Sequence, residues 1–169
     1  QTLKASMPTQ QRQLSVGLAR TPAEVQEAQR LRYKIFAEEM GARLVSARDG
    51  IDCDRYDPFC DHLLVKDKQT GEVVGTYRML TPEKAQEAGG LYSQSEFDLS
   101  RLAHILPNTV EVGRSCVHPD YRTGATIGLL WNGLANYMMQ RGYGYLLGCA
   151  SMSMADGGHN AANVYQSVK

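Results

Sequence analysis

Two charged residues, Glu111 and Arg114, stand in a segment that otherwise has the composition of an interior β-strand, residues 109–117. A charge in a central strand is costly unless it is paired or used by the protein. Strict alternation places the two side chains on opposite faces, whereas a bulge at Gly113 brings them to the same face. The carboxylate could then act as a general base, with an internal salt bridge as the alternative.

Arg32 is a third charge in an unexpected position. Residues 21–41 carry helix signals, with Thr21 as the cap and Glu24 completing a capping box. At about 100° per residue, Arg32 and Glu39 fall within about 10° of the centre of the apolar face. A guanidinium that faces the core needs anionic partners. Arg32 therefore either forms a structural ion pair or lines a site.

Acidic residues cluster in the polar loop 42–61, at Asp52, Asp54 and Asp57. Closely spaced carboxylates can hold an ammonium group or a metal ion, or they can form a solvated loop with local turns. Arg32 could pair with one of them. The pair Cys60-x-His62 is half of a metal site, but no second pair at ligand spacing accompanies it, so no metal is expected. The four cysteines are expected to be buried, reduced thiols.

The turn between residues 117 and 126 connects the charged strand to a helix. Small residues at such a turn allow backbone amides to approach a phosphate, and the helix N-terminus adds a positive dipole. The candidate anion-binding residues are Val117, Arg122, Thr123, Gly124, Ala125 and Thr126.

The elements that position these residues follow from periodicity. We expect strands at 14–18, 62–66, 72–80, 109–117 and 143–150, the last one buried, and helices at 21–41, 126–140 and from 160 onward. Short helices are expected within 81–100. This order predicts an α/β (α+β) fold with a mixed sheet and helices on its faces. Residues 1–13 are expected to be a flexible leader and 14–169 a single domain, truncated at its C-terminus.

Composition excludes several classes of protein. The 18 basic and 18 acidic residues balance, which argues against nucleic-acid binding. No run of about 18 apolar residues could span a membrane. The polar N-terminal segment lacks the apolar core of an export signal, so a cytoplasmic location is expected.

A family resemblance rests on the segment Val117-His-Pro-Asp-Tyr-Arg122, which precedes a small-residue turn and a helix. It resembles the acyl-donor motif of the GNAT acyltransferases. The resemblance implies a three-layer αβα fold whose mostly antiparallel sheet is splayed between the Glu111 and Leu146 strands. It also implies that Glu111 is the catalytic base, that loop amides hold the phosphate of coenzyme A or phosphopantetheine, and that Tyr165 protonates the departing thiolate.

The upstream motifs are more specific. The segments 31–36, 54–57, 77–80 and 111–114 resemble the acyl-homoserine-lactone synthases in order and spacing, while 38–42, 60–62 and 113–119 are more similar to the L-ornithine Nα-acyltransferases. The lactone synthases carry Trp where this chain has Ala42. The resemblance implies that the acceptor and carrier side is shaped by Arg32, Phe36, Asp54, Asp57, Arg78 and Arg114.

The implied reaction moves a (3-hydroxy) fatty acyl group from the phosphopantetheine of acyl carrier protein to the α-amine of L-ornithine, the first step of ornithine lipid synthesis. Peripheral contact with the inner membrane is consistent with that product. The usual GNAT loop is Arg/Gln-x-x-Gly-x-Gly/Ala, and Ala125 and Ile127 depart from it, which favours a donor with a single phosphate over acyl-CoA. The alternatives are a lactone synthase using S-adenosylmethionine, a CoA-dependent N-acetyltransferase, and an inactive acyl-carrier-binding module.

Overall fold

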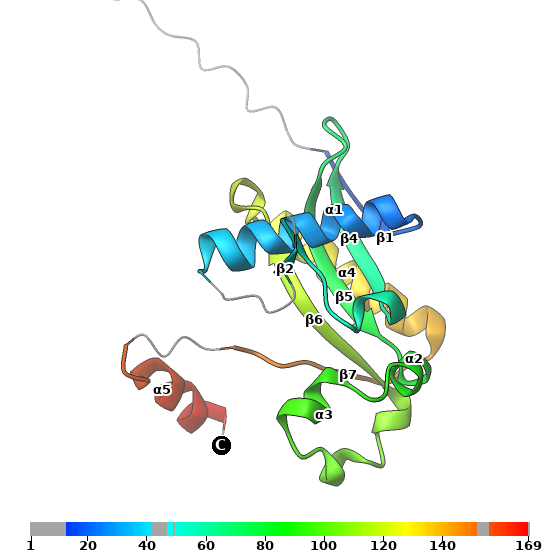
Figure 1. The fold of residues 1–169 in the computed structure, drawn as a ribbon, viewed down its shortest axis with the longest axis vertical. Helices are drawn as coiled ribbons and strands as arrows, with labels where there is room; N and C mark the ends of the chain where they lie inside the picture. Colours follow the sequence, from blue (N-terminus) through cyan, green and yellow to red (C-terminus); the bar gives the residue numbers. More distant parts are fainter. Residues whose placement is uncertain (1–12, 42–46, 49, 152–155, 169) are drawn as a thin grey trace, which may run out of the picture.

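The protein is built on a five-stranded sheet in the order β1-β4-β5-β6-β7 (Figure 1). A computed structural model describes residues 13–41, 47–48, 50–151 and 156–168, so the predicted leader lies almost entirely outside the described residues. The strands are β1 (Leu14–Leu18), β4 (Asp61–Asp67), β5 (Val73–Leu80), β6 (Thr109–Val117) and β7 (Tyr145–Leu147). Neighbours pair antiparallel except β6 and β7, which are parallel. The strands β2 (Ala47–Arg48) and β3 (Ile51–Asp52) form a separate two-stranded ladder.

Helices cover both faces of the sheet, as the sequence predicted. Helix α1 (Pro22–Tyr33) crosses one face and α4 (Gly124–Arg141) lies behind the other (Figure 1). Alternation along β4 explains the layers, because Leu63 and Val65 join the core formed with α4, while Lys66 faces the other way and pairs with Glu24 of α1 at 2.8 Å. The three-layer αβα arrangement and the mixed, mostly antiparallel sheet are confirmed.

The remaining elements are short. They are α2 (Pro82–Glu87), α3 (Tyr92–Glu96), α5 (His159–Val168) and the 3₁₀ turns η2 (Asp57–Phe59), η3 (Ser100–Leu102), η4 (Leu106–Asn108) and η5 (Pro119–Tyr121). None of the helices in the described ranges is long and apolar enough to cross a membrane.

The first helix starts as predicted but changes its winding near its end. The hydroxyl of Thr21 accepts a bond from the Glu24 amide at 3.3 Å. The π-helical segment η1 (Lys34–Glu39) follows α1, and the Met40 amide bonds to the Ile35 carbonyl at 3.0 Å. The wider turn rotates the last residues away from the phase of an α-helix. The prediction that Glu39 faces the core is therefore wrong, and its side chain is exposed.

A bulge in β6 lies one residue later than predicted. Tyr77 of β5 stands opposite both Arg114 and Ser115, and Arg114 has φ of +51°. Among the described residues it is the one non-glycine with positive φ. Such strain persists where the surroundings enforce it, often at functional sites. The bulge brings Arg114 and Glu111 to the same cavity.

The prediction of a buried strand at residues 143–150 is mostly wrong. Only Tyr145–Leu147 pairs, and these residues are exposed or half-buried because β7 is the edge strand of the sheet. Cys149 follows this strand and is exposed, as is Cys53, so the expectation of four buried thiols is confirmed for Cys116 but not for these two.

Candidate active site

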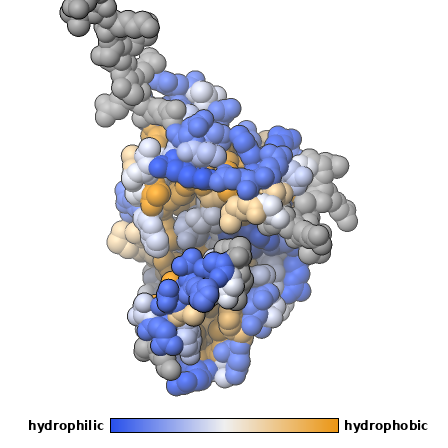
Figure 2. Space-filling view, turned by 90° about the vertical axis from the view of Figure 1, so that its left-hand side faces the viewer, coloured by the Kyte–Doolittle hydropathy of each residue, from blue (hydrophilic) through white to orange (hydrophobic). Residues whose placement is uncertain are grey.

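A cavity of about 510 Å³ opens between β6 and the segment that follows β7. The face shown in Figure 2 is hollowed near its middle, with α5 in front of the hollow. The cavity volume is typical of a small-molecule site. The lining residues are Phe36, Met40, Tyr56, Cys60, Tyr77, Arg78, Leu80, Tyr92, Ser93, Glu111, Val112, Gly113, Arg114, Ser115 and Gly148–Ser151.

The cavity exists because two parallel strands part. The ladder between β6 and β7 ends where Glu111 pairs with Leu147, and the chains separate beyond that pair. At Gly148 a Cβ atom would lie 2.9 Å from the carbonyl oxygen of Val112, so glycine permits the last close approach before the split. The predicted splay between the Glu111 and Leu146 strands is confirmed.

Glu111 lies in the cavity wall at the point of separation and is 7% exposed. Its Oε1 accepts a hydrogen bond from the Tyr92 amide at 2.8 Å, and its Oε2 accepts one from the Ser93 amide at 2.7 Å. The Ser93 hydroxyl also donates to Oε2. The carboxylate therefore caps the first turn of α3 from the neighbouring strand, because residue Leu91 in the N-cap position has no side-chain acceptor.

Arg32 lies beneath the cavity and is completely buried. Its Nη1 and Nη2 donate to the two oxygens of Asp57 at 2.8 and 2.9 Å, and its Nε donates to Asp52 Oδ2 at 2.8 Å. The prediction that this guanidinium needs anionic partners is confirmed. Arg32 is not among the lining residues, so it holds the acidic loop against α1.

Two arginines that line the cavity, Arg78 and Arg114, also contact the acidic loop. Arg78 Nη1 lies 2.6 Å from Asp54 Oδ1 and 3.5 Å from Asp57 Oδ2. Arg114 lies 3.5 Å from Asp52 and 3.6 Å from Asp54, and its guanidinium carbon is 5.9 Å from the centre of the Phe36 ring. The aspartates thus orient Arg78 and Arg114, and no described group of acidic, His and Cys residues is arranged to hold a metal ion.

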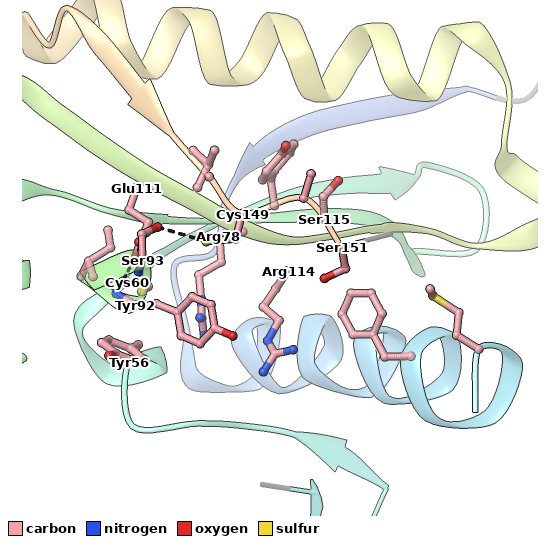
Figure 3. A pocket seen from close by; sticks show the side chains of 18 residues that line it. Tyr56, Cys60, Arg78, Tyr92, Ser93, Glu111, Arg114, Ser115, Cys149 and Ser151 are labelled. Carbon is pink, nitrogen blue, oxygen red and sulfur yellow. Dashed lines mark hydrogen bonds between the residues drawn. The ribbon is translucent and has the colours of Figure 1, made fainter. Parts of the chain in front are cut away.

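The charges that line the cavity are two guanidiniums, Arg78 and Arg114, and one carboxylate, Glu111 (Figure 3). The Arg114 side chain is 30% exposed, whereas that of Arg78 is 9% exposed. Arg114 is therefore the cation more accessible to a ligand. This lining suits a molecule that carries both a carboxylate and an amine.

The family model "Acetyltransferase (GNAT) domain" matches residues 31–132. The chain belongs to the GNAT family. It is 44% identical over 147 residues to the L-ornithine N(alpha)-acyltransferase of Brucella abortus (strain 2308), covering 82% of this chain and 52% of that protein. The corresponding protein of Rhizobium meliloti (strain 1021) is 42% identical over 147 residues, with 82% and 50% covered. This GNAT chain spans about half the length of the curated relatives it matches.

Solved GNAT-like structures share the fold. One is the CoA-dependent acyl-homoserine lactone synthase BjaI with SAM and isopentyl-CoA. Its TM-score is 0.57 at 21% identity, with 83% of this chain and 66% of that chain covered.

The predicted donor turn, residues 117–126, leads into the capped start of α4. Thr123 caps α4, its hydroxyl accepting from the Thr126 amide at 3.4 Å, which leaves the amides of Gly124 and Ala125 without intrahelical acceptors. Thr126 itself is fully buried, and its methyl group lies toward Gly75. Its amide and hydroxyl lie 3.4 and 3.3 Å from Thr123 Oγ1, and its contact with a donor stays a prediction.

Two other predicted donor residues have partners in this structure. The Arg122 guanidinium donates to Glu39 Oε2 at 2.6 Å and to the Val117 carbonyl at 3.2 Å. The bond from Arg122 lowers the pKa of Glu39. Arg122 thus joins the donor turn to the π-helical segment η1.

Among the predicted site residues, Tyr165 has the position that differs most from the predicted one. It belongs to α5, is 61% exposed, and is not among the residues that line the cavity. Its role as the acid stays a prediction. Ala42, the residue that distinguishes this chain from the lactone synthases, lies outside the described residues.

Ser93 and Cys149 are among the cavity residues that sequence reasoning did not assign to the site. Ser93 is 1% exposed, and its Oγ lies 3.3 Å from Cys149 Sγ. A pair of small polar residues 56 positions apart carries no recognisable spacing, so only the fold brings them together. The available signal was the position of Cys149 within the predicted strand 143–150, whose residues Tyr145–Leu147 pair with β6.

Acid is expected to destabilise the fold in two stages. Burial lowers the pKa of His62, so stability falls as the pH drops below about 6.5, where the unfolded chain binds the proton. Burial alone would raise the pKa of Asp57, but the bonds and charge of Arg32 outweigh it and lower that pKa to about 2. The stabilisation from Asp57 is present above about pH 4 and is lost as the pH falls towards 2, costing about 2–3 kcal/mol.

Urea unfolding followed by circular dichroism at pH 7, 5 and 3 measures this dependence. The Asp57→Asn variant, which is less stable at neutral pH, should lose less additional stability between pH 5 and pH 3 than the wild type. Equal losses would show that Asp57 is not the titrating group.

Proposed function

We propose that this chain is the acyl-transfer domain of an enzyme that acylates the α-amine of L-ornithine. The observation that carries the proposal is the cavity between the parting strands, whose lining combines Glu111 with two arginines. The names of the relatives, at 42–44% identity, support ornithine as the acceptor. The product would be the lyso precursor of an ornithine lipid.

The acyl donor enters along the free edge of β6. Among the described residues, none pairs with this strand on the β7 side beyond Glu111, so the backbone between Val112 and Val117 is available to a pantetheine arm. The amides of Gly124 and Ala125 at the positive end of α4 bind its phosphate. Arg122 exchanges its bond with Glu39 for one to that phosphate. A (3-hydroxy) fatty acyl group on acyl carrier protein is the donor we favour over acyl-CoA.

The acceptor is oriented by charge. The guanidinium of Arg114 binds the α-carboxylate of ornithine, which places the adjacent α-amine near Glu111. Arg78 and Phe36 complete this side of the cavity, and Asp54 and Asp57 hold Arg78 in place. Arg32 contributes by fixing the acidic loop.

The chemistry follows from these positions. Glu111 takes the proton from the α-ammonium, the free amine attacks the thioester carbonyl, and the pantetheine leaves as a thiolate. Tyr165 protonates that thiolate if α5 approaches the cavity in the donor complex. The enzyme works in the cytoplasm and meets the inner membrane peripherally through its amphipathic product.

A thiol-release assay with purified full-length protein tests the proposal. The donors are a 3-hydroxyacyl carrier protein and the matching acyl-CoA, and the acceptors are ornithine and S-adenosylmethionine. Thiol release with carrier protein and ornithine is the expected result. Release with S-adenosylmethionine instead would favour a lactone synthase, which the fold shared with BjaI makes the second candidate. Tight carrier binding without release would indicate a non-enzymatic carrier-binding module.

A further inference from the structure

The carboxylate of Glu111 is held by the helix α3, which restricts how a ligand can reach its Oε2 oxygen. Both of its oxygens accept hydrogen bonds from the first turn of α3, through the amides of Tyr92 and Ser93 and the hydroxyl of Ser93. Oε2 accepts from both the amide and the hydroxyl of Ser93, so both of its lone pairs are used, whereas Oε1 accepts one bond, from the Tyr92 amide. A donor on a ligand can therefore pass a proton to Oε2 through the Ser93 hydroxyl without displacing a bond at that oxygen.

Ser93 connects this carboxylate to the opposite wall of the cavity. Its hydroxyl lies between Glu111 Oε2 and Cys149 Sγ, the latter at 3.3 Å (Figure 3). An ionised carboxylate can only accept, so the Ser93 O–H donates to Glu111. The lone pairs of the same oxygen then accept from the Cys149 S–H. The chain of bonds runs in one direction, from the cavity wall to Glu111.

The contact with Cys149 is the exchangeable link in this chain. A thiol is a weak donor, whereas an ammonium N–H is a strong, charge-assisted one. The α-ammonium of an amino-acid acceptor would therefore displace the thiol from the lone pair of Ser93 with little loss. The same displacement at Glu111 Oε2 would break a bond from the amide or the hydroxyl of Ser93.

We propose that the Ser93 hydroxyl relays the acceptor's proton to Glu111, an inference that rests on the proposed function. The α-ammonium gives a proton to Ser93 Oγ while the Ser93 proton passes to Glu111 Oε2, leaving a neutral amine and a neutral carboxyl group. The amine nitrogen then bonds to the thioester carbon, the carbon–sulfur bond breaks, and the nitrogen loses its second proton. The thiolate leaves as a thiol after taking up a proton, and Glu111 releases its proton to solvent.

The test compares Ser93→Ala with wild-type protein in acyl transfer to ornithine. At pH 7 the variant is expected to lose about 10²-fold in kcat, with little change in the KM for ornithine. The deficit should shrink as the pH rises to 9.5, because an α-amino group with a pKa of about 8 then loses its proton to water without the relay. Ser93→Thr keeps the hydroxyl and should restore most of the rate.

Ser95→Ala is the matched control. Ser95 lies on the same short helix, is exposed, and donates its hydroxyl to the Tyr92 carbonyl, so wild-type kcat is expected. Circular dichroism establishes that each variant is folded, and the threonine variant carries the test if the alanine variant is not.

The outcomes separate this inference from the proposed function. A Ser93→Ala variant with wild-type kcat at pH 7 overturns the relay while leaving ornithine acylation in place. A deficit that stays constant from pH 7 to 9.5 also overturns it, because a purely structural role of Ser93 would not depend on the protonation of the amine. Wild-type protein that acylates no ornithine with any donor would contradict the proposed function, and the relay with it.

Discussion

Replacing Arg32 with methionine is expected to lower the free energy of unfolding by about 3–5 kcal/mol. The guanidinium is completely buried and donates to both Asp52 and Asp57. Its removal leaves two buried carboxylates with one neutralising partner fewer each. Because domains of this size are stable by only about 5–15 kcal/mol, the variant should be poorly folded at 37 °C. Guanidinium chloride unfolding followed by circular dichroism measures the loss.

Arg30→Met is the control for this experiment. Arg30 lies on the same helix and is exposed, and in the part of the chain that the structure describes its side chain bonds to the Gln26 side chain at 3.0 Å. Its replacement should change the free energy of unfolding by less than about 0.5 kcal/mol. Equal effects at positions 30 and 32 would show that the buried ion pairs do not hold the acidic loop.

Replacing Glu111 with glutamine is expected to reduce acyl transfer by about 10²–10⁴-fold. An amide cannot take up the proton that the α-ammonium must lose. The substitution also points an NH₂ group at one of the donors of α3, which should cost about 1–3 kcal/mol of stability. The rate is therefore measured with protein shown by circular dichroism to be folded at the assay temperature.

Glu87→Gln serves as the matched control for loss of a carboxylate. Glu87 lies at the exposed end of α2 and pairs with Lys84 at 2.8 Å, away from the cavity lining. This variant should retain wild-type activity. Full acyl transfer by folded Glu111→Gln protein would remove Glu111 as the base and leave it only as the cap of α3.

Much of the candidate site could be predicted from local patterns. Arg32 is a charged residue on the apolar face of a helix whose start is clearly marked. Only buried ion pairs can compensate such a charge, and Arg32 forms them with Asp52 and Asp57. Glu111 and Arg114 are likewise charged residues in a strand of interior composition. A bulge brings both of them to the cavity. Such residues are visible in a sequence because a buried charge has a large energetic cost that the surroundings must offset.

The features that the sequence did not predict depend on the winding of one helix and on contacts between segments that are far apart in the chain. The π-helical segment η1 rotates Glu39 to the surface. There its carboxylate pairs with Arg122 instead of facing the core. Helical phase computed at a constant angle per residue cannot detect that change. The cap that Glu111 provides for α3, and the bond from Ser93 to Cys149, join segments that only the sheet topology brings together.

The predicted donor turn shows how a motif can place a residue correctly without showing whether its side chain is buried. Thr126 lies in the first turn of α4, as the motif implies, yet it is buried against β5. The helix phase decides which of the small residues face outward, and that phase is set by Thr123 as the cap. The amides of Gly124 and Ala125 are the ones left without intrahelical acceptors, and their contact with a phosphate stays a prediction.

The most direct test of the central claim is mass spectrometry of the product that full-length protein makes from a mixed pool of acyl carrier thioesters and amino acids. The account predicts a single class of product, ornithine carrying one fatty acyl group, with fragmentation placing the amide on the α-nitrogen. An acyl-homoserine lactone formed when S-adenosylmethionine is added, acylation of the δ-nitrogen, or acylation of a different amino acid would contradict it.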